Sequence, residues 1–268
     1  MFHMKRLVIL TIVCVLAACG GGGNENDNTV GEDGEIIVWD RDPSAVIFRA
    51  DVTGGNTDPF FVKGEIPLCT IYGGGTVVWT TDAGDPTAEV LFGPVDDARI
   101  RRFIENQTVF REIYTYDAQA DVMALGQNPV VETLTITVNG LTHTTDAFAE
   151  WPPNYFEEIV AECQTLSPRP QIYQPVDGAW VLAERREYDN NSPSILWDPI
   201  ATGLDLGTVA DSGQPVWVSG ALARALWAQL RRTSPDLQFG QESGNYVIVL
   251  QIPNITRESL PAPQNTGE

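Results

Sequence analysis

Pairs of acidic residues are the most frequent pattern with chemical potential in this 268-residue chain. Two carboxylates that face each other across a cleft can cleave a glycosidic bond, and carboxylate oxygens are also calcium ligands. The loop Asp82-Ala83-Gly84-Asp85 could hold calcium, although the spacing of an EF-hand is absent. In so acidic a chain most close pairs are solvated loop residues, so the pairs by themselves predict no site. They are Asp40 and Asp42, Asp82 and Asp85, Asp96 and Asp97, and Glu157 and Glu158.

Histidine and lysine offer little for catalysis. Beyond the N-terminal segment the chain has one histidine, His143, and one lysine, Lys63. A Ser-His-Asp site through His143 has no supporting Gly-x-Ser-x-Gly motif. A single histidine cannot build a histidine-rich zinc or copper site. We therefore expect His143 to lie on the surface of a strand, and we assign no catalytic residue, no metal ligand and no cofactor.

Aromatic and basic residues give weaker indications. Tryptophan rings can stack on sugars, and Trp151, which two prolines follow, is the best candidate for an exposed ring. Tryptophans within strand patterns are expected in the core, namely Trp39, Trp79, Trp180 and Trp217. Paired arginines are expected on polar faces beside acidic neighbours, namely Arg101-Arg102, Arg185-Arg186 and Arg231-Arg232.

The first nineteen residues have the pattern of an export signal. Lys5 and Arg6 precede the uncharged segment 7–18, in which only Thr11 is polar. As a helix this segment would rise about 18 Å, and a bilayer core needs about 20 residues. The segment therefore fits the apolar part of a secretory signal rather than a membrane span. Its end, Leu16-Ala17-Ala18-Cys19, resembles the lipobox of bacterial lipoproteins.

The resemblance implies a signal peptide over residues 1–18 and a mature protein that begins at a lipid-modified, palmitate-bearing Cys19. Residues 19–35 are rich in Gly, Asn and acidic residues and hold one aliphatic residue, Val30, so we predict a flexible tether. The partner implied is the membrane, reached through the lipid on Cys19. Because Gly20 rather than Asp follows the cysteine, we expect the outer membrane of a diderm bacterium, or the outer face of the plasma membrane otherwise.

The charge of the chain excludes several partners. Lysine and arginine number 16 against 36 acidic residues, a net charge of −20. Loss of residues 1–18 would remove Lys5 and Arg6 and no acid, which leaves a net charge near −22. A field of this sign repels phosphate, so nucleic acid and anionic head groups are excluded as partners. Solubility outside the cell explains the charge, and cation binding is the sharper alternative.

Two cysteines remain for the folded part, because Cys14 leaves with the signal and Cys19 carries the lipid. Cys69 lies in a predicted strand and Cys163 on the apolar stripe of a predicted helix. Exported proteins often contain disulfides, so these two can pair across a long loop. The sequence leaves a Cys69–Cys163 disulfide and two separately buried thiols equally open.

The remaining pattern predicts an α+β fold with antiparallel sheets. Most strands alternate in polarity, and Asn139-Gly140 is typical of a type I′ hairpin turn. About three helices should pack on the sheets, near residues 97–105, 155–166 and 220–231, after Asp96, a capping-box Asn154 and Ser219. The predicted strands are 36–39, 45–52, 66–72, 76–80, 89–92, 109–116, 131–138, 141–145, 180–188, 216–218 and a central 246–252.

The predicted organisation has two sections. Residues 36–166 form a first α+β domain, 167–175 a Pro-rich linker, 176–260 a second α+β section and 261–268 a disordered tail. Each section holds a strand followed by a helix with an arginine pair. Two similar subdomains from a duplication would explain this order, and so would chance.

These features predict a lipid-anchored extracytoplasmic protein. The hairpin segment 67–78 resembles one in uncharacterised exported bacterial proteins, a likeness that implies no activity. We expect binding or scaffolding of an envelope protein or ligand rather than catalysis. An extracellular hydrolase that uses paired carboxylates, for instance on glycans, is the alternative from another class.

Overall fold

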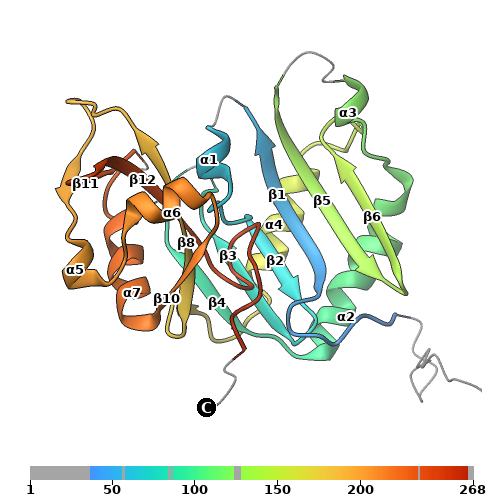
Figure 1. Ribbon diagram of the computed structural model, residues 1–268. Coiled ribbons are helices and arrows are strands. Elements are labelled where there is room, and N and C mark those ends of the chain that lie inside the picture. Colours follow the sequence, from blue (N-terminus) through green and yellow to red (C-terminus); the bar gives the residue numbers. More distant parts are fainter. Residues whose placement is uncertain are drawn as a thin grey trace, which may run out of the picture. The chain divides into compact units, whose positions relative to one another are not determined.

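The computed structural model describes residues 37–264 except 56–57, 84, 86, 124–127 and 235. The predictions for the signal peptide, for Cys19 with its tether and for the last four residues lie outside the described residues. The described residues belong to one compact unit, in which helices pack on two sheets (Figure 1). The fold is α+β, as the sequence predicts.

The first sheet has seven strands in the order β6-β5-β1-β2-β3-β4-β7, and all neighbouring strands are antiparallel. The β5–β6 turn has φ angles of 54° at Asn139 and 72° at Gly140, which confirms the predicted type I′ hairpin. The turn between β2 and β3 needs Gly73, since a Cβ there would overlap the carbonyl oxygen of Asp40. The strands are β1 (Val46–Gly54), β2 (Cys69–Tyr72), β3 (Thr76–Thr80), β4 (Val90–Pro94), β5 (Val130–Val138), β6 (Leu141–Asp146) and β7 (Gln171–Ile172).

The second sheet has five strands in the order β10-β8-β12-β11-β9. Strand β12 is central, as its continuous apolar sequence predicts. The pairing of β9 with β11 is parallel, so this sheet is mixed. The two sheets thus differ in the number and order of their strands. The strands are β8 (Gly178–Arg186), β9 (Ser194–Leu196), β10 (Val216–Ser219), β11 (Gln238–Gln241) and β12 (Gly244–Gln251).

The three longest helices lie where the sequence predicts them. They are α2 (Asp97–Glu105), α4 (Tyr155–Gln164) and α7 (Gly220–Leu230). Asp96 caps α2, because its side chain accepts a hydrogen bond from the amide of Arg99. The predicted capping box at α4 is wrong, since Asn154 has φ 61° and its side chain caps nothing. The shorter helices are α1 (Pro59–Val62), α3 (Ala120–Met123), α5 (Pro199–Thr202) and α6 (Leu206–Ser212).

The strand predicted at 109–116 is wrong. A π-helical turn, Asn106–Phe110, continues α2, and a 3₁₀ turn follows at Ile113–Thr115. Asn106 and Gln107 both donate side-chain hydrogen bonds to the carboxylate of Glu162 in α4, at 2.8–3.0 Å. These contacts with a distant helix hold the segment in helical form despite its β-favouring sequence.

The strand predicted at 36–39 is also absent from the described residues 37–39, which have no regular structure. The backbone of Val38 is bonded instead to the hairpin turn. Its amide donates to Asn139 Oδ1, and the amide of Asn139 donates to the Val38 carbonyl. The hairpin turn therefore satisfies the backbone N–H and C=O groups of Val38, and no strand partner is needed there.

Two cores lie on opposite faces of the first sheet. The first core packs α2 and α4 against β1, β2, β3 and β5 (Figure 1). The second joins the other face, through Tyr72, Val78 and Val90, to the second sheet and to α6 and α7. Because both sheets contribute to the second core, burial of apolar area couples them.

A disulfide between Cys69 of β2 and Cys163 of α4 crosses the first core. Both residues are fully buried. Their Cα atoms are 6.3 Å apart, within the range that a disulfide bridges. The bond fixes α4 to the centre of the first sheet.

A buried ion cluster joins the end of the chain to the first sheet. Arg257 donates two hydrogen bonds to the carboxylate of Asp51 in β1, at 2.6 and 2.7 Å, and one to Glu65 at 2.7 Å. It also donates to the carbonyl of Val52 at 2.8 Å. The side chains of Arg257 and Asp51 are only 11% and 7% exposed. Bidentate pairing of this kind compensates the burial of both charges.

Arg257→Gln should lower the free energy of unfolding by about 3–5 kcal/mol, because it leaves the Asp51 carboxylate buried without a counter-ion. Urea unfolding measures the change. Arg232→Gln, at an exposed arginine, is the control and should stay within about 0.5 kcal/mol of the wild type. A similarly small effect of Arg257→Gln would contradict the importance of the cluster.

Replacement of Cys69 and Cys163 together by Ala should lower the free energy of unfolding by up to about 4–5 kcal/mol, since the bond closes a loop between residues 94 positions apart. A reductant should destabilise the wild type and leave the double variant unchanged. Peptide mapping without reductant should recover the two cysteines in one linked pair of peptides. Two thiols that alkylate after unfolding would contradict the bond.

Candidate functional site

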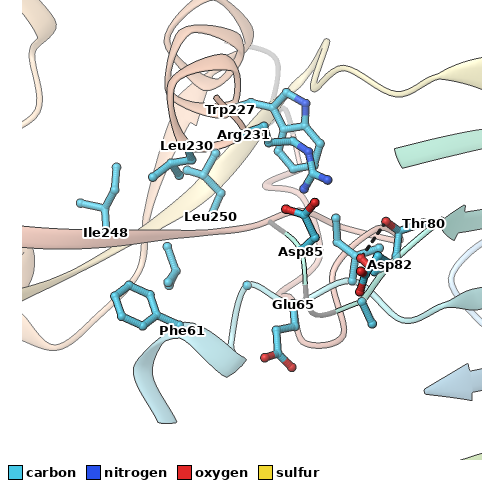
Figure 2. A pocket seen from close by; sticks show the side chains of 14 residues that line it. Phe61, Glu65, Thr80, Asp82, Asp85, Trp227, Leu230, Arg231, Ile248 and Leu250 are labelled. Carbon is cyan, nitrogen blue, oxygen red and sulfur yellow. Dashed lines mark hydrogen bonds between the residues drawn. The ribbon is translucent and has the colours of Figure 1, made fainter. Parts of the chain in front are cut away.

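A cleft of about 200 Å³ opens where four segments of the compact unit meet. They are the end of α7, the strand β12, α1 with the segment after it, and the end of β3 with the loop after it (Figure 2). Since Ile66, Ile248 and Leu250 also belong to the second core, the cleft is an opening at the border of that core. Its lining is Phe61, Gly64, Glu65, Ile66, Thr80, Asp82, Ala83, Asp85, Trp227, Leu230, Arg231, Ile248, Val249 and Leu250.

One end of the cleft is apolar. Figure 2 shows Phe61, Leu230, Ile248 and Leu250 together at this end, away from the charged groups. Ile248 and Leu250 are two positions apart and so lie on one face of β12. Leu230 continues the apolar stripe of α7 and is half-buried. The strand and the helix together therefore provide an apolar wall for a ligand.

The other end carries acidic side chains, among them Asp85. Asp85 Oδ1 accepts hydrogen bonds from both the hydroxyl and the amide of Thr87, each at 2.7 Å. These bonds hold the pKa of Asp85 below its usual range, the hydroxyl contributing most. Asp85 is thus a fixed negative charge at the mouth of the cleft.

Arg231 faces this acidic end from α7. Its guanidinium lies 4.7 Å from the centre of the Trp227 ring, a cation–π contact. Burial lowers the pKa of Arg231 to about 10, and the charge of Asp85 opposes that shift. Arg231 therefore remains protonated at neutral pH. Figure 2 shows its guanidinium directed toward Asp85.

Glu65 completes the charged end. Its Oε2 accepts a hydrogen bond from Arg257 at 2.7 Å, so the buried ion cluster fixes this side of the cleft. Burial raises the pKa of Glu65, and the positive charge of Arg257 opposes the rise. The carboxylates of Glu65 and Asp85 thus have pKa values shifted in opposite directions within one cleft.

The other acidic pairs named from the sequence serve the fold. Asp96 caps α2, and Asp97 forms an ion pair with Arg41 at 2.6 Å. Asp42 accepts hydrogen bonds from the hydroxyl and the amide of Ser44. Glu158 pairs with Arg111 at 2.8 Å. Of the four pairs, only Asp82 and Asp85 line the cleft.

His143 is half-buried on β6, which corrects the expectation of a surface position. Its Nε2 lies 3.0 Å from the carbonyl oxygen of Ile113 and 2.9 Å from that of Tyr116. The ring also packs edge-on against Tyr114. These contacts give His143 a structural role in holding the 3₁₀ turn against the sheet.

Trp151, the best candidate for an exposed ring, is half-buried. Its Nε1 donates to the hydroxyl of Thr145 at 2.9 Å, and its ring is stacked on Phe156. Of the tryptophans expected in the core, Trp39 and Trp79 are buried. Trp180 and Trp217 are half-buried and pack edge to face against each other.

The sequence singled out Asp82 and Asp85 but assigned Arg231 to a polar face and gave no role to Glu65. Arg231 directly follows Leu230, the last apolar residue of the α7 stripe. This place beside the apolar stripe was the sequence signal that could have indicated a half-buried arginine. Its proximity to Asp85 depends on how a distant loop folds. Cys69 and Cys163 lie in the first core and not in the cleft.

Within the described residues, no three or more His, Cys, Asp or Glu side chains are grouped so as to hold a metal ion. In the same part of the chain, every helix is too short or too polar to cross a bilayer. Comparison with known protein families, curated proteins and solved structures finds no match to this chain.

Proposed function

We propose that this chain is a lipid-anchored protein of the cell envelope whose compact unit binds a small ligand in the cleft. The observation that carries the proposal is the cleft itself, which combines an apolar wall with a few fixed charges. This combination is typical of small-molecule sites, where apolar walls supply affinity and a few polar groups orient the ligand.

Two independent features support the location. The lipobox-like segment ends at Cys19 and precedes a polar stretch, 19–35, long enough to separate a folded unit from a membrane. The disulfide between Cys69 and Cys163 fits an oxidising compartment, since such bonds are rare in the reducing cytosol. The proposed anchor is the lipid on Cys19, in the outer membrane of a diderm or on the outer face of a monoderm plasma membrane.

An extracellular hydrolase is the second candidate. The observation in its favour is the opposite shift of the pKa values of Glu65 and Asp85, as in an acid–base pair of carboxylates. The contact of Glu65 with Arg257 favours binding instead, because it occupies one carboxylate oxygen and stabilises the charged form. A general acid must be protonated before it acts, so a contact that stabilises the charged form suits a structural carboxylate better.

Cys19→Ala should move the protein from the membrane fraction to the soluble fraction. An acyl chain contributes roughly 0.8 kcal/mol of membrane affinity per buried CH₂, which the variant would lack. Cell fractionation measures the distribution. Cys14→Ala is the matched control and should stay with the membrane, because Cys14 is expected to leave with the signal. A Cys19→Ala protein that still pellets after a salt wash would contradict the anchor.

Leu230→Trp should block the cleft, since the larger ring replaces a side chain of its apolar wall. Ligand-observed NMR with a fragment library would detect binding to the full chain in detergent. Fragments that bind the wild type should no longer bind Leu230→Trp. They should still bind Ala225→Trp, the control at an exposed position of the same helix. Equal binding to both variants would place the ligand elsewhere.

The same samples distinguish binding from hydrolysis. Glycan oligosaccharides incubated with the wild type should remain intact if the protein only binds. Cleavage that Asp85→Asn abolishes and the exposed control Glu89→Gln retains would favour the hydrolase.

A further inference from the structure

The N–H groups of the Arg231 guanidinium are the most informative feature of the cleft. Among the described residues no acceptor forms a hydrogen bond with its guanidinium, whose contacts are the Trp227 ring and the through-space attraction of Asp85. The side chain is half-buried. An arginine so placed has a planar set of N–H groups available, and that geometry matches a carboxylate in a bidentate fashion.

Asp85 supplies the complementary acceptor. Both hydrogen bonds from Thr87 go to Oδ1, and no described residue donates to Oδ2. Thr87 orients the carboxylate, and Oδ2 is free to accept from a ligand. A cationic group beside Oδ2 would also suit the surplus of negative charge on the chain.

The apolar wall adds a third requirement. Leu230, Ile248 and Leu250 lie at the other end of the same cleft and offer no hydrogen-bonding side chain (Figure 2). The volume of about 200 Å³ is below the roughly 300–1,000 Å³ of sites for drug-sized molecules. The ligand is therefore small, with one apolar branch and two opposite charges close together.

We propose that the cleft binds a free α-amino acid with an aliphatic side chain, such as leucine. Its carboxylate contacts Arg231, its ammonium contacts Asp85 Oδ2, and its side chain packs on Leu230, Ile248 and Leu250. The inference rests on the proposed function and specifies its ligand class. A zwitterion satisfies Arg231 without adding net negative charge, whereas a simple carboxylate would meet the repulsion of the surrounding acids.

Isothermal titration of the full chain in detergent with L-leucine tests the proposal. Binding should be saturable, and three analogues should bind at least about tenfold more weakly, because each lacks one required group. Leucinamide lacks the carboxylate, N-acetyl-leucine lacks the ammonium and glycine lacks the side chain. If leucinamide or N-acetyl-leucine bound as tightly as L-leucine, the proposal that the cleft requires a zwitterion would be overturned.

Variants of the two charged residues locate the site. Arg231→Gln and Asp85→Asn should each weaken leucine binding at least about tenfold. Arg231→Lys keeps the positive charge but not the planar guanidinium. Its affinity for leucine should therefore lie between those of Arg231→Gln and the wild type. The exposed neighbours Arg232→Gln and Glu89→Gln are matched controls and should bind like the wild type. Asp85 is exposed in a loop, so its variant stays informative even if Arg231→Gln fails to fold.

The outcomes separate the two proposals. If L-leucine gives no heat while fragments still bind and Leu230→Trp blocks them, the amino-acid class is wrong and the binding function stands. If neither leucine nor any fragment binds in the cleft, both are wrong. If leucine binds Arg231→Gln and Asp85→Asn as tightly as the wild type, the assigned contacts are wrong.

Discussion

The Arg257 cluster is the interaction on which the arrangement of this protein most depends. Arg257 follows the last strand of the second sheet, and Asp51 lies in β1 of the first. Their two short hydrogen bonds therefore connect the two sheets next to the buried side chains of Ile252 and Ile255. The backbone amide of Arg257 also donates to the carbonyl of Glu65, which adds a main-chain link.

The cluster also determines the shape of the cleft. Glu65 accepts a hydrogen bond from Arg257 and also belongs to the charged end of the cleft. Its position is therefore set by the ion cluster and not by solvent. On the opposite side, the second core fixes α7 and β12 and thereby places Trp227 under Arg231. The Asp85 carboxylate is oriented locally, by the hydroxyl of Thr87. The charged residues of the cleft are thus positioned by three separate parts of the structure.

Local patterns were sufficient to predict the elements that do not depend on distant partners. The helices at 97–105, 155–164 and 220–230 have strong apolar periodicity, and the Asn139-Gly140 turn has intrinsic φ preferences. Segments shaped by distant contacts were missed or wrongly assigned. Residues 106–110 become helical through Glu162, and the short strand β9 forms by pairing with β11, more than 40 positions away. The cleft could not be predicted for the same reason. The sequence contains Arg231 and Asp85, but only the folded structure brings them close together.

The separation of Asp51 and Arg257 by 206 positions has a consequence for the order of assembly. At about 5–20 residues per second, a ribosome makes Arg257 roughly 10–40 s after Asp51. During that interval β1 carries a carboxylate whose counter-ion does not yet exist, so the first sheet cannot reach its final state. A chain that lacks Arg257 would keep this defect, because Asp51 would stay buried without its counter-ion.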